Sequence, residues 1–275
     1  LNIDEDHLDF FKDLADIRHS FRKFAELLPA DGTLVINGEI PELHEITDGL
    51  ACRVVTYGPD SSYDYSATNI LHDQIGEASF DFVKNGEFVT RIALSVNGDH
   101  NVSNALAALA VADILKIDPK TAGQGLKDFH GTNRRFEYKG EFDGVTVIDD
   151  YAHHPTEIAA TLTAATHYPH REIWCIFQPH TYTRTKALFP EFVEALSHTD
   201  HVILADIYAA RETDTLGVSS ADIASRIEKL GTPAHYIPSF DEIETFILEH
   251  CMQGDVLITM GAGDIVRVGE KLLGE

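Results

Sequence analysis

The chain has 275 residues, of which 44% are apolar and 24% are charged, and its formal net charge at pH 7 is −24. These proportions are typical of a soluble globular protein, and the length predicts two domains. The excess of negative charge argues against nucleic acid as a partner and disfavours an anionic membrane surface. No apolar run approaches the roughly 18 residues that span a bilayer, so we expect no membrane insertion.

Three cysteines lie far apart, at Cys52, Cys175 and Cys251, and form no metal or disulfide pattern. This usage fits a reducing cytoplasm, and no signal peptide is visible, so we expect a cytoplasmic protein. The chain begins at Leu1 inside an ordered-looking motif, which predicts a fragment of a longer protein. The sequence predicts no particular oligomeric state.

The first half of the chain predicts one amphipathic helix and then short strands. Apolar side chains recur at helical spacing at Phe10, Leu14, Ile17, Phe21 and Phe24. Between residues 33 and 96 the pattern indicates short strands, including a hairpin whose Asn85-Gly86 supplies the positive φ angles of a type I′ turn. Residues 101–115 predict a helix that is apolar nearly all round, and therefore buried.

Beyond residue 132 the chain alternates between apolar β segments and amphipathic helices, which predicts a parallel, doubly wound sheet. The strands are expected at residues 145–149, 172–177, 201–206, 234–238 and 255–260. The segment Ser239-Phe240-Asp241-Glu242 has the pattern of a capping box before the fourth of the intervening helices. We therefore predict an α/β protein with domains at 1–132 and 133–275.

The strand predicted at 145–149 runs into two carboxylates, a phenol and two imidazoles, from Asp149 to His154. Ligands bind at the carboxyl ends of strands in α/β sheets, where an aspartate can accept a hydrogen bond from a ribose hydroxyl. The next strand ends near His180 and Arg184. Together with His153 these two residues could hold a carboxylate or a transferring phosphoryl group. The structural alternative is that His180 and Arg184 form a buried polar pair.

Two motifs in the first half have both a structural and a functional interpretation. Residues 2–9 combine carboxylates with His7, which fits either a solvated acidic loop or a site for a divalent metal. Asn101 and Asn104 lie one turn apart on a helix otherwise made of small and apolar residues. They fit either an N-cap or the recognition of a planar polar group such as adenine.

The Arg134-Arg135 pair at the predicted boundary fits either a soluble surface or a phosphate clamp, because guanidinium groups bind phosphate bidentately. The segment Gly261-Ala262-Gly263-Asp264 lacks the third glycine of a dinucleotide fingerprint, so we interpret it as a close strand-to-helix turn. No G-x-x-x-x-G-K-[ST] loop occurs in the chain.

Taken in order, these segments resemble the Mur ligases, and within that family its alanine-adding branch. The resemblance covers essentially the whole chain. The matching segments are Asp6-His7-Leu8-Asp9, His100-Asn101-Val102-Ser103-Asn104-Ala105-Leu106-Ala107, Gly131-Thr132-Asn133-Arg134-Arg135-Phe136-Glu137, Asp149-Asp150-Tyr151-Ala152-His153-His154-Pro155-Thr156-Glu157 and Gln178-Pro179-His180-Thr181-Tyr182-Thr183-Arg184-Thr185.

Family members have a UDP-sugar domain, a central P-loop ATPase domain and a C-terminal Rossmann-like domain. The resemblance implies that residues 1–132 are the later part of the central ATP-binding domain and that residues 133–275 are the C-terminal domain. A fragment without the P-loop is expected to be inactive. Several relatives carry a carbamylated lysine in the helix after the Asp-His motif, but Arg22 stands nearest that position here, beside Lys23, so we predict no carbamylation.

For the nucleotide, the resemblance implies two cofactors, ATP and Mg²⁺. It implies that His7 ligates the Mg²⁺ and that Asn101 and Asn104 hold adenine. Arg135 would hold the phosphates and Asp150 the ribose.

For the other substrates, the resemblance implies that Tyr151, His153, His180 and Arg184 surround the incoming amino acid and the carboxylate that is activated. Of these, His153, His180 and Arg184 are expected to be catalytic. Thr181 stands where some alanine-adding members carry a basic residue.

The implied reaction is ADP-forming amide ligation in peptidoglycan precursor synthesis. The carboxylate of UDP-N-acetylmuramate becomes an acyl phosphate, which the amine of L-alanine attacks. One alternative is the recycling ligase of the same family, which attaches a preformed peptide to the same sugar nucleotide. Another is a non-catalytic module that binds nucleotide or amino acid. A metal-dependent hydrolase is disfavoured because the adjacent His153 and His154 should diverge at a strand-to-helix junction.

Overall fold

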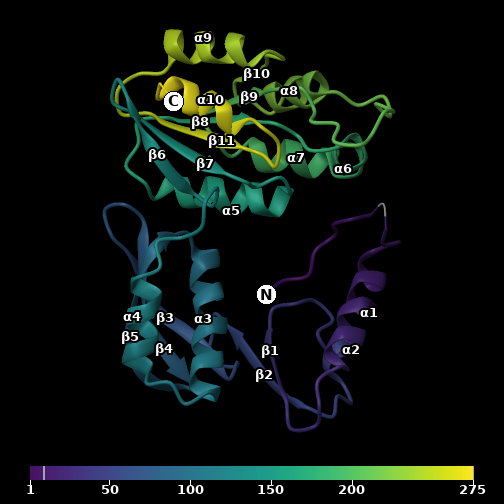
Figure 1. The fold of residues 1–275 in the computed structure, drawn as a ribbon, viewed down its shortest axis with the longest axis vertical. Helices are drawn as coiled ribbons and strands as arrows, with labels where there is room; N and C mark the ends of the chain where they lie inside the picture. The colour runs from purple at the N-terminus through teal and green to yellow at the C-terminus, as the bar shows by residue number, and fades with distance from the viewer. Residues whose placement is uncertain (9, 275) are drawn as a thin grey trace. The chain divides into compact units, whose positions relative to one another are not determined.

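The structure is a computed structural model that describes residues 1–8 and 10–274. The chain divides into two compact units, Leu1–His130 and Gly131–Glu275, each with its own sheet (Figure 1). The division lies close to the predicted boundary at residue 132. Both units mix helices and strands, as predicted, and no helix among the described residues is long and apolar enough to cross a membrane.

The first unit has a sheet in the order β1-β2-β3-β4-β5. Strands β1, β2 and β3 pair in parallel, whereas β3, β4 and β5 pair antiparallel. The predicted hairpin joins β4 to β5, with φ of 48° at Asn85 and 79° at Gly86. The elements are α1 Leu14–Ala25, β1 Thr33–Asn37, α2 His44–Thr47, β2 Arg53–Gly58, β3 Tyr65–His72, β4 Glu77–Lys84, β5 Glu87–Asn97, α3 Asp99–Ile114 and α4 Pro119–Lys127.

One expectation about burial in this unit is wrong, namely that the helix predicted at residues 101–115 is buried nearly all round. Helix α1 buries Ile17 and Ala25, but Phe21 and Phe24 on its predicted apolar face are 45% and 71% exposed. Helix α3 packs Val102, Ala105, Leu106, Leu109 and Ala110 into the core, yet it is not buried all round. A stripe at helical spacing stays exposed, at Asn104, Ala108, Val111 and Leu115. Apolar periodicity identifies a face that can be buried, and it does not show what covers that face.

The second unit has a sheet in the order β10-β9-β8-β11-β7-β6. Every pair in it is parallel except β6 with β7. All five predicted strands are present, and the edge strand β6 is an addition to them. The elements are β6 Glu137–Phe142, β7 Val145–Asp150, α5 Pro155–Thr166, β8 Ile173–Phe177, α6 Tyr182–Ala187, α7 Phe189–Leu196, β9 His201–Leu204, α8 Ser220–Glu228, β10 Ala234–Tyr236, α9 Phe240–His250, β11 Val256–Met260 and α10 Val266–Leu272.

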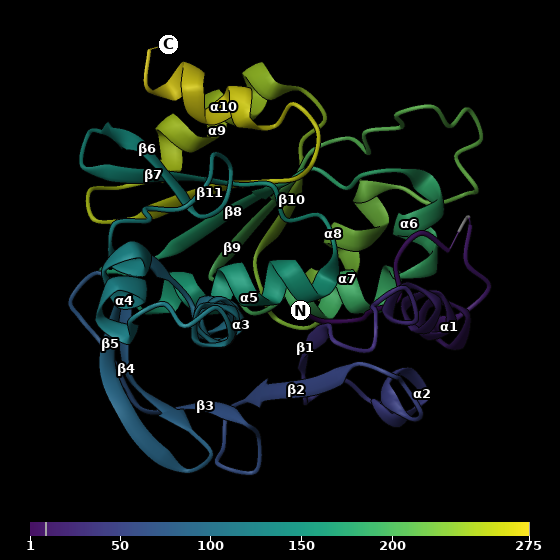
Figure 2. The same cartoon turned by 60° about the horizontal axis from the view of Figure 1, so that its bottom comes forward.

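Helices cover both faces of this second sheet, as a doubly wound fold requires (Figure 2). Successive strand residues alternate between two cores, so that Cys175 packs with α5, α7 and α8, whereas Trp174 and Ile176 pack with α9 and α10. The predicted capping box at Ser239 is wrong, because its side chain makes no capping hydrogen bond. A capping box forms instead at the start of α8, between Ser219 and Asp222.

Candidate functional site

The parallel strands of the second sheet end level with one another. Asp150 of β7 pairs with Met260 of β11, which pairs with Phe177 of β8, which in turn pairs with Leu204 of β9. The loops that follow these strands therefore begin at one edge. This carboxyl edge is where ligands bind in open α/β sheets.

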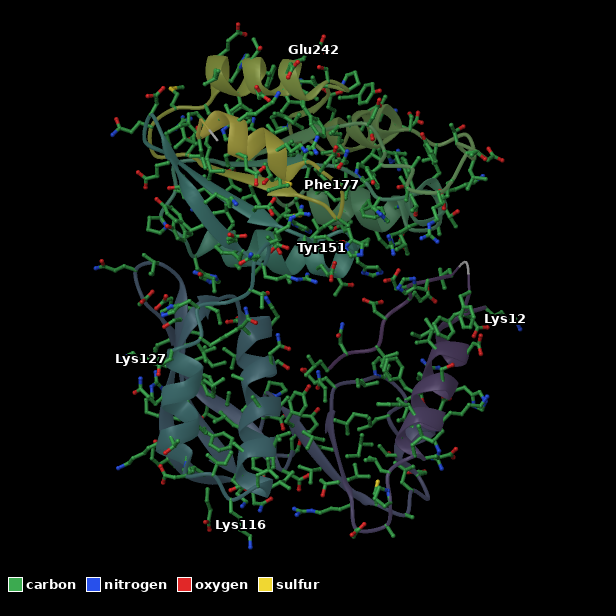
Figure 3. The ribbon with its side chains drawn as sticks, in the orientation of Figure 1. Lys12, Lys116, Lys127, Tyr151, Phe177 and Glu242 are labelled. Carbon is green, nitrogen blue, oxygen red and sulfur yellow. The ribbon has the colours of Figure 1, made fainter. Side chains whose placement is uncertain are left out.

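Aromatic rings from three of these loops form a continuous row along the edge. The ring centroids of Tyr151 and His153 lie 5.5 Å apart, and those of His153 and His180 lie 6.0 Å apart. The imidazole of His180 stacks on Tyr208 at 5.6 Å with an interplanar angle of 18°. Tyr151 is 36% exposed and is labelled in Figure 3. The structure thus gathers the predicted Tyr151, His153 and His180, and it adds Tyr208.

Arg184, the fourth predicted substrate residue, joins this row through His180. Its Nη1 lies 3.2 Å from Nδ1 of His180. A guanidinium only donates, so Nδ1 must accept, and the proton of a neutral His180 is then on Nε2. Both side chains are half-buried, so they are not the fully buried polar pair of the structural alternative.

His153 has the opposite tautomer. Its Nδ1 lies 3.0 Å from the carbonyl oxygen of Tyr151, which can only accept, so Nδ1 carries a proton, and in the neutral ring Nε2 is then an acceptor. Glu157 accepts the backbone N–H of His153 at 3.1 Å. The edge therefore combines an imidazole that can take a proton at Nε2 with another that donates from Nε2. His154 differs from both, because its ring caps α5 by accepting from the N–H of Thr156.

Beneath the row, Arg134 makes contacts that the sequence analysis missed. Its Nε donates to Oδ2 of the fully buried Asp149 at 2.8 Å. Its other nitrogens donate to the carbonyl oxygens of Gly261 and Gly263, at 2.7 and 3.2 Å. The guanidinium carbon lies 4.9 Å from the ring centroid of Tyr151. One arginine thus holds together the loops after β7 and β11.

Arg135, predicted to hold phosphates, is placed very differently from its neighbour. Its side chain is 50% exposed, and its Nη1 lies 3.5 Å from Oε1 of Glu157. Its guanidinium carbon is 5.7 Å from the centroid of the Tyr151 ring. An exposed guanidinium at the edge of the site is available to an anionic ligand, so the phosphate role stays a prediction.

Asp150, predicted to hold a ribose, is engaged within the chain. It is 5% exposed and accepts from the N–H of Ala152 at 2.8 Å, the N–H of Phe136 at 3.0 Å and the hydroxyl of Thr161 at 3.0 Å. Burial raises the pKa of Asp150, and these hydrogen bonds partly offset that effect. A carboxylate offers about four acceptor positions, and these three hydrogen bonds leave about one for a ribose hydroxyl.

The segment Gly261-Ala262-Gly263-Asp264 is a close turn, as expected. A Cβ at Gly261 would lie 2.7 Å from the carbonyl oxygen of Gln178, and a Cβ at Gly263 would lie 2.2 Å from its Oε1. At Gly261, whose φ is 146°, the backbone of Gln178 approaches so closely that only glycine fits, whereas at Gly263 the nearest atom belongs to the Gln178 side chain. The turn therefore shapes the floor of the carboxyl edge.

In the first unit, the N-cap interpretation of Asn101 and Asn104 is wrong. Helix α3 is capped by Gly98, at φ 92° and ψ 141°, without a side-chain hydrogen bond. Asn101 instead donates to the carbonyl oxygen of Asn97 at 2.8 Å, and the amide nitrogen of Asn104 lies 3.1 Å from Oδ1 of Asn101. The two amides are thus connected, and Asn104 is exposed. Such a pair can hydrogen-bond the edge of an adenine.

At the predicted Mg²⁺ site, the neighbouring Asp6 lies close to His7. The Nε2 of His7 lies 3.6 Å from Oδ2 of Asp6, and the backbone of His7 is left-handed, at φ 53°. Asp9 lies outside the described residues. Over residues 1–8 and 10–274, no three His, Cys, Asp or Glu residues gather in a way that could hold a metal. Mg²⁺ commonly takes only one or two protein ligands beside phosphate and water, so His7 and Asp6 fit a shared site and not a closed one.

The two departures from the family pattern both have structural roles here. Arg22 of α1 donates to the carbonyl oxygens of Ile46 and Asp48 and to Glu26. Thr181 is the N-cap of α6, and its hydroxyl accepts from the N–H of Arg184 at 3.4 Å.

Two residues of the edge, Tyr208 and Glu212, escaped the sequence analysis, which considered Arg134 only as a surface residue or a phosphate clamp. A signal for Tyr208 and Glu212 was present, because they follow β9 just as the predicted site residues follow β7 and β8. Applying the strand-end rule to the third strand would have found them.

Two models of the same family match the chain. The Mur ligase middle domain matches residues 1–112, and the Mur ligase, glutamate ligase domain matches residues 134–263. These ranges fall within the two compact units.

Curated relatives match over nearly the whole chain. The UDP-N-acetylmuramate--L-alanine ligase of Lachnospira eligens is 56% identical over 274 residues, which are 99% of this chain and 60% of the relative. The enzyme of the same name from Clostridium acetobutylicum is 48% identical over 273 residues, 99% of this chain and 59% of the relative. The chain therefore spans about three fifths of the length of these relatives.

Solved structures agree with this match. The UDP-N-acetylmuramate-alanine ligase of Thermotoga maritima superposes with a TM-score of 0.77 at 28% identity, over 98% of this chain and 56% of that one. The MurF ligase of the same organism, solved in complex with ADP, gives 0.77 at 18% identity, over 100% of this chain and 60% of that one, which shows the fold alone. By its two domain models and its relatives, the chain belongs to the Mur ligase family.

Proposed function

We propose that these residues are part of an ADP-forming ligase that joins L-alanine to UDP-N-acetylmuramate in peptidoglycan precursor synthesis. The names of the relatives support this proposal, as does their identity of 56% and 48% to this chain. The observation that carries it is the row of Tyr151, His153 and His180, together with Arg184, which is hydrogen-bonded to His180. A guanidinium and two imidazoles of opposite tautomer suit an amino acid that must be held by its carboxylate and deprotonated at its amine.

The amino acid would lie along this row. Arg184 can bind its α-carboxylate through two parallel hydrogen bonds, and Nε2–H of His180 can add a third. The acceptor Nε2 of His153 can take the proton that the ammonium group must lose before it attacks. ATP, with Mg²⁺, would supply the phosphoryl group that turns the sugar carboxylate into an acyl phosphate. Arg134 would act indirectly, by fixing the loops on which the row is built.

Nucleotide contacts are proposed for each unit by itself. In the first unit, Asn101 and Asn104 would bind adenine through their connected amides, and His7 would ligate Mg²⁺. In the second unit, the exposed Arg135 would contact phosphates, and Asp150 would accept a ribose hydroxyl. The three cysteines are free, and two of them are buried. Free cysteines are typical of the reducing cytoplasm, where ATP is also available, so we propose a cytoplasmic location.

The test compares acceptors in the full-length enzyme, with UDP-N-acetylmuramate and ATP–Mg²⁺ present. We expect ADP and the alanine adduct with L-alanine, and a much lower rate with a tripeptide. A preference for the tripeptide would instead indicate the peptide-recycling ligase of the family. These 275 residues contain no G-x-x-x-x-G-K-[ST] loop, so by themselves they should not hydrolyse ATP. If the full-length enzyme ligates neither acceptor, a non-catalytic binding role replaces the proposal.

A further inference from the structure

The turn that carries His180 and Arg184 is strained. It passes through Thr181, whose φ of 66° places a β-branched residue in the left-handed region that favours glycine. Arg184 depends on this turn twice, through its backbone N–H to the hydroxyl of Thr181 and through its guanidinium to His180. Such a backbone persists only where its surroundings hold it in place.

The loop after β9 provides that hold. Tyr208 accepts from the N–H of Thr181 at 2.9 Å and donates its own N–H to the carbonyl oxygen of Pro179 at 2.8 Å, and its ring stacks on His180. Four residues later, Oε2 of Glu212 accepts the N–H groups of Tyr182 and Thr183, at 2.5 and 3.0 Å. These N–H groups begin α6 and have no partner within the helix.

Glu212 is charged at neutral pH. Burial raises its pKa, but hydrogen bonds from Thr183 and Tyr182 and the neighbouring His180 together outweigh burial, so the pKa lies below its ordinary value. A charged acceptor strengthens both N–H bonds. The carboxylate therefore contacts the amides at the start of α6, and Arg184 lies on the first turn of that helix.

We propose that Glu212 is a positioning residue for the amino-acid substrate, which fixes the strained turn so that His180 and Arg184 face the carboxylate together. The inference rests on the proposed function and deepens it. Glu212 does not touch the substrate. It acts through the backbone of Tyr182 and Thr183, and its loss should weaken amino-acid binding without affecting the nucleotide.

Two variants and a matched control test this proposal. Glu212→Ala removes the acceptor, whereas Glu212→Gln keeps an amide oxygen that can still accept an N–H. Asp200 provides the control, because its carboxylate also accepts a backbone N–H, that of Ile173 at 2.8 Å, but at the opposite edge of the sheet, where β8 begins.

The first measurement is amide hydrogen exchange in the 275-residue chain. In Glu212→Ala we expect the amides of Tyr182 and Thr183 to exchange at least about tenfold faster, with the core strands unchanged. The second is steady-state kinetics of the full-length enzyme. We expect the KM for L-alanine to rise at least about tenfold in Glu212→Ala and less in Glu212→Gln, with the KM for ATP within about twofold. Asp200→Ala should leave the KM for L-alanine unchanged.

An unchanged KM for L-alanine in Glu212→Ala would overturn the inference while leaving the proposed function intact. So would an equal rise in Asp200→Ala, or a rise in the KM for ATP that matches the rise for alanine. Faster exchange throughout the unit would also overturn it, because Glu212 would then stabilise the whole fold and not the turn. A wild-type enzyme that forms no alanine adduct would refute the proposed function itself, and the inference would fall with it.

Discussion

Replacing Arg134 with methionine should destabilise the second unit strongly. The guanidinium compensates Asp149, whose side chain is 0% exposed, and it also donates to the carbonyl oxygens of Gly261 and Gly263. Methionine keeps part of the packing volume but donates no hydrogen bond. The variant therefore leaves a buried carboxylate with one remaining side-chain donor, the hydroxyl of Thr259 at 2.7 Å.

The magnitude follows from the burial of this pair. Removing one partner of a buried ion pair costs about 3–5 kcal/mol. The side chain of Arg134 is 24% exposed, so solvent screening favours the lower limit, about 3 kcal/mol. For a domain of about 150 residues each kcal/mol shifts the Tm by about 2–4 °C, so the Tm should fall by about 6–12 °C.

The loss should depend on pH, in a direction that Asp149 sets. Burial raises the pKa of Asp149, and Arg134 and Thr259 only partly offset that effect. A carboxyl group whose pKa is raised in the folded state stabilises the fold fully below its unfolded pKa of about 3.9, and this stability is lost as the pH rises through the folded pKa. Without Arg134 the folded pKa rises further, so the gap between wild type and variant should be larger at pH 8 than at pH 5.

Thermal unfolding of the 275-residue chain, followed by circular dichroism at both pH values, measures this directly. The adjacent Arg135→Met is the matched control, because Arg135 is 50% exposed and faces a Glu157 that is 37% exposed. Exposed pairs contribute about 0–1 kcal/mol, so its Tm should move by at most a few degrees. A decrease in Tm of less than about 2 °C in Arg134→Met, or an equal decrease at both pH values, would refute the reasoning.

Three further predictions concern Arg184, Asn104 and two glycines. Arg184→Lys loses the bidentate fork, so kcat/KM for L-alanine in the full-length enzyme should fall about 100-fold, near 3 kcal/mol; unchanged alanine kinetics would contradict the assigned role. Asn104→Ala removes one of the connected amides, worth about 1–2 kcal/mol, and should raise the KM for ATP about tenfold while leaving that for alanine unchanged; wild-type ATP kinetics would exclude an adenine contact. Gly261→Ala places a Cβ 2.7 Å from the backbone carbonyl oxygen of Gln178 and should lower stability by about 1–3 kcal/mol, whereas Gly125→Ala, with open space in α4, should raise it by up to about 1 kcal/mol. Thermal unfolding that moved both glycine variants in the same direction would show that space is not the deciding factor.

Much of the fold could be predicted because local patterns determine it. Apolar runs indicated all five parallel strands of the second sheet, and Asn85-Gly86 indicated the hairpin of the first. The rule that ligands bind at strand ends predicted that His153 and His180 are neighbours, although they lie far apart in the chain. The structure places their rings 6.0 Å apart.

What the sequence could not predict depends on contacts between distant segments. Arg134 and Asp149 are separated by 15 positions, and no local pattern shows that one compensates the other. Strand β6 escaped prediction because its six residues, Glu137–Phe142, are largely polar and gain a partner only from β7. The exposure of Phe24, at 71%, could not be predicted either, because the helical spacing of apolar residues does not show which surface covers that face.

A crystal structure of the full-length enzyme with L-alanine and a non-hydrolysable ATP analogue tests the central claim most directly. We expect the alanine carboxylate within hydrogen-bonding distance of the guanidinium of Arg184 and of Nε2 of His180, with its amine toward His153. An alanine bound elsewhere, with these three side chains arranged as they are here and contacting no substrate, would contradict the assignment of the carboxyl edge as the amino-acid site.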